Sequence, residues 1–193
     1  MLFDEFYYKY KYIDIYYLKT DPYEHFMKTG KNEYREPFEL DSVDFNSYIK
    51  LNNIEKDIKL DNLKKHIIDN IINENIQINF IVDTLTINDI FYKKYNNIYF
   101  DWNIYIESNP ELNYIKEECL AINHFINIGF KQKKQFCKIP DNYNYEFMNN
   151  KYCTSFKNNI ESWINYVYKI QFIKPKQKIL WNDYIYRYSD LID

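Results

Sequence analysis

Residues 101–112 read DWNIYIESNPEL, and residues 124–129 read HFINIG. In the first stretch, aromatic and aliphatic side chains recur at helical spacing and are followed by an Asn-Pro pair, which is typical of a helix that ends before a new capped turn. The second stretch continues an apolar stripe that begins at Leu120 and stops at a glycine, which favours a second short helix. The residues that carry the two patterns are Trp102, Tyr105, Asn109, Pro110, His124, Phe125 and Gly129.

Both patterns occur again elsewhere in the chain. Residues 25–30 read HFMKTG, so the two glycines of the chain both stand five residues after a histidine. Residues 44–52 read DFNSYIKLN and correspond to residues 101–109 at six of nine positions. A half copy, WNDYIYRYSDL, begins at Trp181. We infer a tandem repeat with a period of about 40 residues.

The first copy shows how the glycine half begins and ends. Asp21 is expected to be a helix N-cap, and Pro22 suits the first helical position because the nitrogen there needs no hydrogen bond. Gly30 is expected to end this helix as a left-handed residue. All repeat-motif residues are expected to be structural; besides those above they are His25, Phe26, Glu33, Arg35, Trp181 and Tyr184.

Each copy is therefore predicted to be a small helical hairpin that buries aromatic side chains against its neighbours. The longest helical pattern covers residues 54–72. Residues 76–87 alternate enough for a small β-hairpin, and the abundance of Tyr, Ile and Phe keeps an α+β fold as the alternative. We predict an all-α fold.

The length of 193 residues leaves room for one compact domain or a short array of repeats. We therefore expect a single domain over residues 1–193 that holds five degenerate copies, of which the last is only a half. The predicted copies are residues 1–40, 41–75, 98–138, 139–172 and 173–193, with an insertion over residues 76–97.

Composition excludes several classes of protein. The net charge is −3 and the densest basic runs hold three lysines each, so nucleic acid is not an expected partner. No stretch approaches the roughly 18 apolar residues of a membrane-spanning helix, and the N-terminus has no signal-peptide pattern, so we expect neither membrane insertion nor classical secretion. Cys119, Cys137 and Cys153 show no Cys-x-x-Cys spacing, which favours reduced thiols in an intracellular compartment over disulfides or a zinc site.

The histidines are the residues that most resemble catalytic or metal-binding groups. His25, His66 and His124 fall at matching places of different copies, so we expect them to be structural and a whole repeat apart. Cys119 lies five residues before His124, a spacing that does not place the two on one face of a helix, so a Cys–His dyad is not expected. The sequence has no glycine-rich phosphate loop and no His-Glu-x-x-His signature, and we predict no metal, no cofactor and no enzymatic activity.

The tryptophans bear on an alternative function. Trp102, Trp163 and Trp181 are expected to be core anchors of their copies. Exposed aromatic side chains beside Asn and Asp would instead suit stacking against sugars. A carbohydrate ligand therefore stays open beside a protein partner.

The two patterns together resemble a known repeat. Its form is aromatic-Asp-x-x-Tyr-Leu-x-x-Asn-Pro-Asp-Leu, followed by His-Tyr/Phe-x-x-x-Gly-x-x-Glu-Gly-Arg. Repeats of this form occur in bacterial surface-polysaccharide proteins and in giant-virus proteins from AT-rich genomes, often beside glycosyltransferase domains. The resemblance, together with the excess of Ile, Asn, Lys and Tyr that an AT-rich gene produces, implies a large DNA virus as the source.

We expect a non-catalytic helical-repeat protein that acts as a structural or protein-interaction module, because repeat stacks form extended surfaces. Its partner would be another protein or a second copy of the chain. The alternative is a carbohydrate-associated accessory module linked to glycan or polysaccharide assembly.

Overall fold

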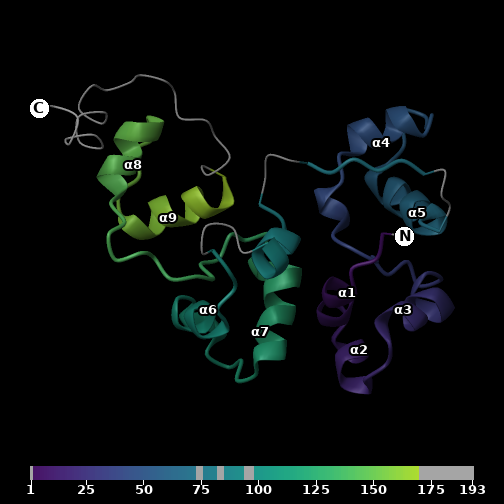
Figure 1. Cartoon of the computed structure of the whole chain (residues 1–193), viewed down its shortest axis with the longest axis horizontal. Helices are drawn as coiled ribbons and strands as arrows, with labels where there is room; N and C mark the ends of the chain where they lie inside the picture. The colour runs from purple at the N-terminus through teal and green to yellow at the C-terminus, as the bar shows by residue number, and fades with distance from the viewer. Residues whose placement is uncertain (1, 73–75, 82–84, 94–97, 170–193) are drawn as a thin grey trace, which may run out of the picture. The chain divides into compact units, whose positions relative to one another are not determined.

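The structure, a computed structural model, describes residues 2–72, 76–81, 85–93 and 98–169 (Figure 1). This part of the chain is mostly helical, which confirms the predicted all-α fold. The α-helices are α1 (Glu5–Lys11), α2 (Ile13–Leu18), α3 (Pro22–His25), α4 (Phe45–Leu51), α5 (Leu60–Asn70), α6 (Trp102–Glu107), α7 (Glu118–His124), α8 (Tyr145–Tyr152) and α9 (Asn159–Tyr168). The π-helical turns are η1 (Phe26–Gly30), η3 (Asp89–Lys93) and η6 (Phe125–Gly129), and the 3-10 turns are η2 (Leu40–Ser42) and η5 (Pro110–Leu112).

The chain divides into two compact bodies, Met1–Lys138 and Ile139–Asp193. The N-terminal body holds α1 to α7, and the C-terminal body holds α8 and α9. Each is described by itself below. The arrangement of all copies in one domain, with the boundaries given above, stays a prediction.

Each of the three copies in the N-terminal body starts at an aspartate that caps a helix. The side chains of Asp4, Asp44 and Asp101 accept hydrogen bonds from backbone N–H groups in the first turns of α1, α4 and α6. The backbone N–H of each aspartate also donates to a carbonyl near the end of its own copy, and this bond closes the copy. The three acceptors are the carbonyl oxygens of Pro37 (2.9 Å), Asn79 (2.9 Å) and Phe136 (3.0 Å).

A tyrosine four residues after each capping aspartate is the anchor of its copy. Tyr8, Tyr48 and Tyr105 are each 0% exposed. Trp102 is half-buried at the first position of α6, so the tyrosine and not this tryptophan fills the centre of the third copy. Trp163 is buried in α9, in line with the prediction. Trp181 lies outside the described residues.

The second helix of the first and third copies changes its pitch after the histidine. In η1 and η6 the backbone bonds run to the fifth residue, as from Phe130 N to Phe125 O (2.8 Å). In the second copy, α5 stays α-helical, and it begins at Leu60 rather than at the predicted Ile54. The first and third copies therefore share a feature that the second lacks.

The predicted left-handed conformation of the two glycines is wrong. Neither Gly30 nor Gly129 has a positive φ, whereas Tyr34 (φ 54°) and Lys133 (φ 53°), four residues later, do. Lys134 N donates to Gly129 O (3.0 Å), which is the long bond of a Schellman cap, and the first copy makes the same bond. The chain therefore continues for one more turn past each glycine before it caps.

Lys133→Gly should stabilise the protein, because a lysine in the left-handed region carries a steric cost that a glycine avoids. We expect the free energy of unfolding to rise by up to about 1 kcal/mol, measured by urea denaturation. Lys116→Gly, at an exposed residue without a positive φ, is the control and should not stabilise. A less stable Lys133→Gly variant would contradict this reading of the cap.

The described part of residues 76–87 pairs with the start of the second copy and not with itself as the predicted β-hairpin. Phe80 makes an isolated antiparallel bridge with Val43, and Ile81 N donates to Ser42 O (2.8 Å). Residues 76–81 therefore close the second copy. Residues 82–84 lie outside the described residues.

Two hydrophobic clusters hold the three copies of the N-terminal body together. The first joins the first and second copies, and its buried members are Tyr8, Ile15, Phe26, Phe38, Leu40, Val43, Tyr48, Leu63, Ile67, Ile68 and Ile71. The second joins the first copy to residues 85–93 and to the third copy through Tyr7, Ile87, Ile122 and Ile126. Figure 1 shows α1 beside α7, and the Asn123 amide fixes this contact by donating to Tyr10 O (2.6 Å).

The described part of the C-terminal body, residues 139–169, matches the start of the predicted copies in the N-terminal body. Asn144 caps α8 as the aspartates cap the other first helices. Met148, which is buried, stands where the other copies have tyrosine. Trp163 and Val167 of α9 are also buried. None of the helices in the described parts of either body has the length and apolarity needed to cross a bilayer.

Candidate functional site

A buried tyrosine hydroxyl contacts a histidine in each of the three copies of the N-terminal body. The tyrosine comes from the first helix of the copy and the histidine from the second, so the bond joins the two halves of the hairpin. The distances from the tyrosine Oη to the histidine Nδ1 are 2.9 Å for Tyr8–His25, 2.8 Å for Tyr48–His66 and 2.7 Å for Tyr105–His124. The sequence reasoning placed the histidines in matching positions but did not predict that each of them bonds to the tyrosine of its own copy.

Burial keeps these phenols neutral. It raises the pKa of Tyr48 to about 12, and it also raises the pKa of Tyr8 and of Tyr105. Burial, with a smaller contribution from the charge of Lys134, lowers the pKa of His124. In the third copy the neutral imidazole and the neutral phenol form a hydrogen-bonded pair that orients two helices. In all three copies the phenol is fully buried and is closed to a substrate.

The glycines leave room for the tyrosine hydroxyls. A Cβ added to Gly30 or Gly129 would lie 2.0 Å from the hydroxyl oxygen of Tyr8 or Tyr105, far inside van der Waals contact. In the second copy Ile71 stands five residues after the histidine, where the other copies have glycine, and it is packed in the core. The glycine and the π-helical turn therefore occur in the same copies. The glycine is explained by the close approach of the tyrosine hydroxyl, which leaves no room for a Cβ.

An asparagine amide ties the end of the first helix to the closing segment of the copy. Nδ2 of Asn109 donates to the backbone carbonyl of the buried tyrosine (2.7 Å) and to Gln135 O (3.0 Å). Asn52 makes the corresponding pair of bonds in the second copy. In the first copy the hydroxyl of Tyr12, at the matching position, accepts from Glu36 N (2.6 Å).

Asn109→Ala should lower the free energy of unfolding by about 1–3 kcal/mol, because two carbonyl groups lose the donor that they share at a buried position. Asn113→Ala, at an exposed residue nearby, is the control and should have little effect. Thermal melts of the two variants give the comparison. Equal melting temperatures for both would show that the amide is not a structural tie.

The remaining motif residues cap, pack or pair. Asp21 accepts from Glu24 N, and Pro22 opens α3. Arg35 donates to Asp14 and Glu33, and Lys134 pairs with Glu111 at the matching place of the third copy. Phe26 and Phe125 are each 0% exposed, and Pro110 opens η5. Tyr184, like Trp181, lies outside the described residues.

The cysteines are all free thiols. Cys119 is buried, and its Sγ lies 3.4 Å from Oε2 of Glu117 and 3.8 Å from the hydroxyl of Tyr17. His124, by contrast, bonds to Tyr105. These partners agree with the expectation that Cys119 and His124 do not act as a pair.

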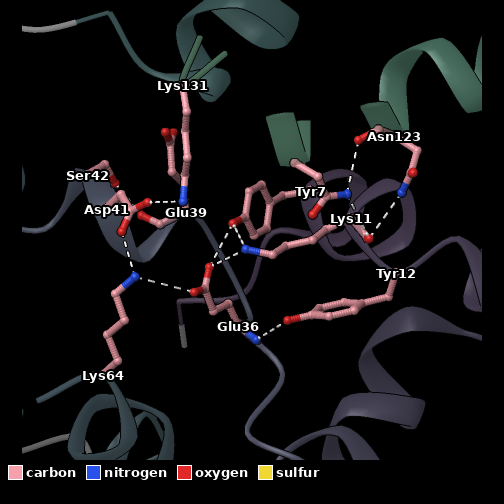
Figure 2. Close-up of polar contacts among 11 residues, drawn as sticks. Tyr7, Lys11, Tyr12, Glu36, Glu39, Asp41, Ser42, Lys64, Asn123 and Lys131 are labelled. Carbon is pink, nitrogen blue, oxygen red and sulfur yellow. Dashed lines mark hydrogen bonds and ion pairs between the residues drawn. The ribbon is translucent and has the colours of Figure 1, made fainter. Parts of the chain in front are cut away.

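A second polar group, here named the junction cluster, joins the three copies of the N-terminal body (Figure 2). Figure 2 shows Lys64 between Asp41 (2.6 Å) and Glu36 (3.6 Å), and Lys131 on the other oxygen of Asp41 (2.8 Å). Burial raises the pKa of Asp41, but the hydrogen bonds from Lys131 and Lys64 outweigh burial and lower it to about 2. The cluster consists of Tyr7, Lys11, Glu36, Glu39, Asp41, Lys64 and Lys131.

Glu39 is the carboxylate of the junction cluster whose charged form is most strongly disfavoured by its surroundings. Burial raises its pKa to about 7, although Ile87 N donates to its carboxylate (2.9 Å). The charges of Asp41 and Asp89 raise this pKa further, and Lys11 lowers it. The sequence reasoning missed the whole cluster, because its members lie far apart in sequence and form no local motif.

A scan against protein-family models, a search of curated proteins and a search of solved structures give no match for this chain.

Proposed function

We propose that the chain is a non-catalytic helical-repeat protein that acts as a structural or protein-interaction module. The observation that carries this proposal is the use of the three histidines, each bonded through Nδ1 to a fully buried tyrosine of its own copy. These are the side chains of the repeat best suited to acid–base chemistry, and the repeat uses them to hold its helices together.

The outer faces of the N-terminal body are polar, which favours a surface exposed to solvent over a face on which a further copy stacks. α7 and η6 pack on α1 through Asn123 and Asn127, whose amides both donate to the Lys11 carbonyl. The matching positions of the first copy are Glu24 on α3 and Lys28 on η1, which form an exposed ion pair. A charged outer face of this kind is typical of a capping repeat, which ends a stack and keeps it soluble.

The face of α6 that corresponds to the packed face of α1 is also polar. Phe6 and Tyr10 of α1 face the third copy, whereas the matching residues of α6, Asn103 and Glu107, are exposed and polar. Within the described part of this body, α6 therefore does not repeat the contact that α1 makes with α7. A partner would meet the outer surface, where tyrosines such as Tyr92 (51% exposed) remain available; tyrosine is enriched at protein interfaces.

The carbohydrate alternative requires exposed, coplanar rings with amide or carboxylate neighbours. The aromatic groove described below has rings tilted by about 40° to one another and lysines beside them. This geometry favours a protein partner over a sugar.

The experiment is a pull-down from native lysate with the full chain as bait, read by quantitative mass spectrometry with and without excess untagged chain. We expect at least one protein near stoichiometric amount that the untagged chain displaces. A bait carrying Gly129→Val, which the structure predicts to be poorly folded, is the control for binding to unfolded protein. Enrichment of a glycosyltransferase alone would favour the carbohydrate alternative, and the absence of any displaced protein would contradict the proposal.

A further inference from the structure

An open groove on the N-terminal body, here named the aromatic groove, lies where α1, the end of α2 and η3 meet. Four aromatic residues line it, Phe6, Tyr10, Tyr16 and Tyr92, and the rest of its lining is Lys9, Lys19, Glu5, Thr20 and Pro22. The cavity volume is about 500 Å³, within the range of sites that bind small ligands or short peptides. Nothing in the repeat plan requires this groove, because Tyr92 belongs to the segment between the second and third copies.

The four rings form a continuous row, in which Phe6 and Tyr10 are partly buried against the third copy and Tyr92 is exposed. The ring centroids of Tyr92 and Phe6 are 5.6 Å apart, and the two rings meet edge to face. Phe6 and Tyr10 follow at 4.5 Å and Tyr10 and Tyr16 at 5.5 Å, each pair tilted by 40°. A sugar ring needs a flat face, whereas a polyproline II segment lays its proline rings into the furrows between tilted aromatic side chains.

The charges of the groove are distributed along this row. At one end the Lys9 ammonium lies over the rings of Tyr10 (5.8 Å) and Tyr16 (5.3 Å), and the exposed Lys19 follows α2 in a left-handed conformation. At the other end the Tyr92 hydroxyl donates to the Asp4 carboxylate (3.0 Å). The basic end is complementary to acidic side chains of a ligand, and the acidic end disfavours them.

We propose that the aromatic groove binds a proline-containing, acidic peptide segment of a partner protein. The prolines lie in the furrows of the ring row, and the acidic residues lie at the end formed by Lys9 and Lys19. The segment binds in the polyproline II conformation, which loses little entropy on binding because it is already populated in the free chain. This inference rests on the proposed function and names the chemistry of the partner.

The test starts with selection from a display library of random dodecapeptides on the immobilised full chain. The most enriched peptide is then labelled and titrated by fluorescence polarisation. We expect enriched peptides to share prolines next to Asp or Glu, and we expect their affinity to fall as salt is added, because Lys19 is exposed and Lys9 is only half-buried.

Two groove variants and two matched controls complete the experiment. Lys19→Glu should weaken the selected peptide at least about fivefold, and Tyr92→Ser should weaken it about tenfold. The controls make the same changes outside the groove, Lys50→Glu on α4 and Tyr114→Ser, and should bind like the unaltered chain. Circular dichroism melts check folding, and the exposed Lys19→Glu keeps the test valid if Tyr92→Ser unfolds.

Several results would overturn the inference. These are the absence of enriched peptides, an enriched set without prolines or acidic residues, and equal binding by groove and control variants. Binding of a glycan array with no peptide enrichment would point to a sugar instead. If the pull-down yields a partner that Lys19→Glu still binds with full affinity, the groove assignment fails while the interaction role stands.

Discussion

Gly129→Ala should lower the free energy of unfolding by about 2–3 kcal/mol, a large effect for one methyl group. The added Cβ would lie 2.0 Å from the hydroxyl oxygen of Tyr105 and 2.9 Å from the ring carbon that carries it. Neither helix can yield easily, because Tyr105 is fully buried and Gly129 lies in the π-helical turn. Urea denaturation followed by circular dichroism measures the effect, and Gly129→Val should be more severe.

A double-mutant cycle separates this cause from a preference for glycine in the backbone. Tyr105→Phe removes the hydroxyl, so Gly129→Ala should cost less in that background, with a coupling energy of about 1 kcal/mol or more. Gly30→Ala combined with Tyr8→Phe should behave in the same way, because its Cβ would also lie 2.0 Å from a hydroxyl oxygen. Additive losses of unfolding free energy in both copies would show that the tyrosine hydroxyl is not the reason for the glycine.

Glu39→Gln should raise the free energy of unfolding by roughly 3–4 kcal/mol at pH 8. The pKa of Glu39 is about 7 in the folded protein because of burial, compared with about 4.3 in an unfolded chain. Between these values the unfolded state loses its proton first, so stability falls as the pH rises from about 4 to 7 and the loss is complete above pH 7. Glutamine keeps an oxygen that accepts from Ile87 N, but it cannot ionise.

Denaturation at a series of pH values provides the measurement. The difference in stability between Glu39→Gln and the unaltered chain should be small near pH 4 and should grow until about pH 7. Glu55→Gln, at an exposed residue, is the control and should show no such growth. A difference that is constant across this range would mean that Glu39 titrates as an ordinary exposed carboxylate.

The all-α fold could be predicted from the sequence because its signals are local. The Asp21 cap, the helical spacing around Tyr105 and the His-Phe pairs each act within one or two helical turns. The form of the repeat quoted above has a second glycine four residues after the first, where this chain has Tyr34 and Lys133. The position of that second glycine is the sequence signal that predicts where the left-handed residue lies.

The contacts between helices could not be read in this way. The tyrosine and histidine of a copy are 17 to 19 residues apart, and their pairing depends on how two helices pack. That nearly constant offset in three copies is the one sequence signal that would have found all three tyrosines. The junction cluster and the aromatic groove leave no such signal. The cluster collects residues from three copies, and the groove joins the first copy to Tyr92, so the members of each meet only in the folded chain.

The measurement that tests the central claim most directly is an NMR spectrum of the full chain with labelled tyrosine and histidine. The account predicts three slowly exchanging tyrosine hydroxyl protons, because all three phenols are fully buried. Each should show a nuclear Overhauser effect to the ring of its own histidine, in the pairs Tyr8–His25, Tyr48–His66 and Tyr105–His124. Rapidly exchanging hydroxyls, or histidine rings in contact with one another, would contradict the claim that the repeat uses its histidines to hold each copy together.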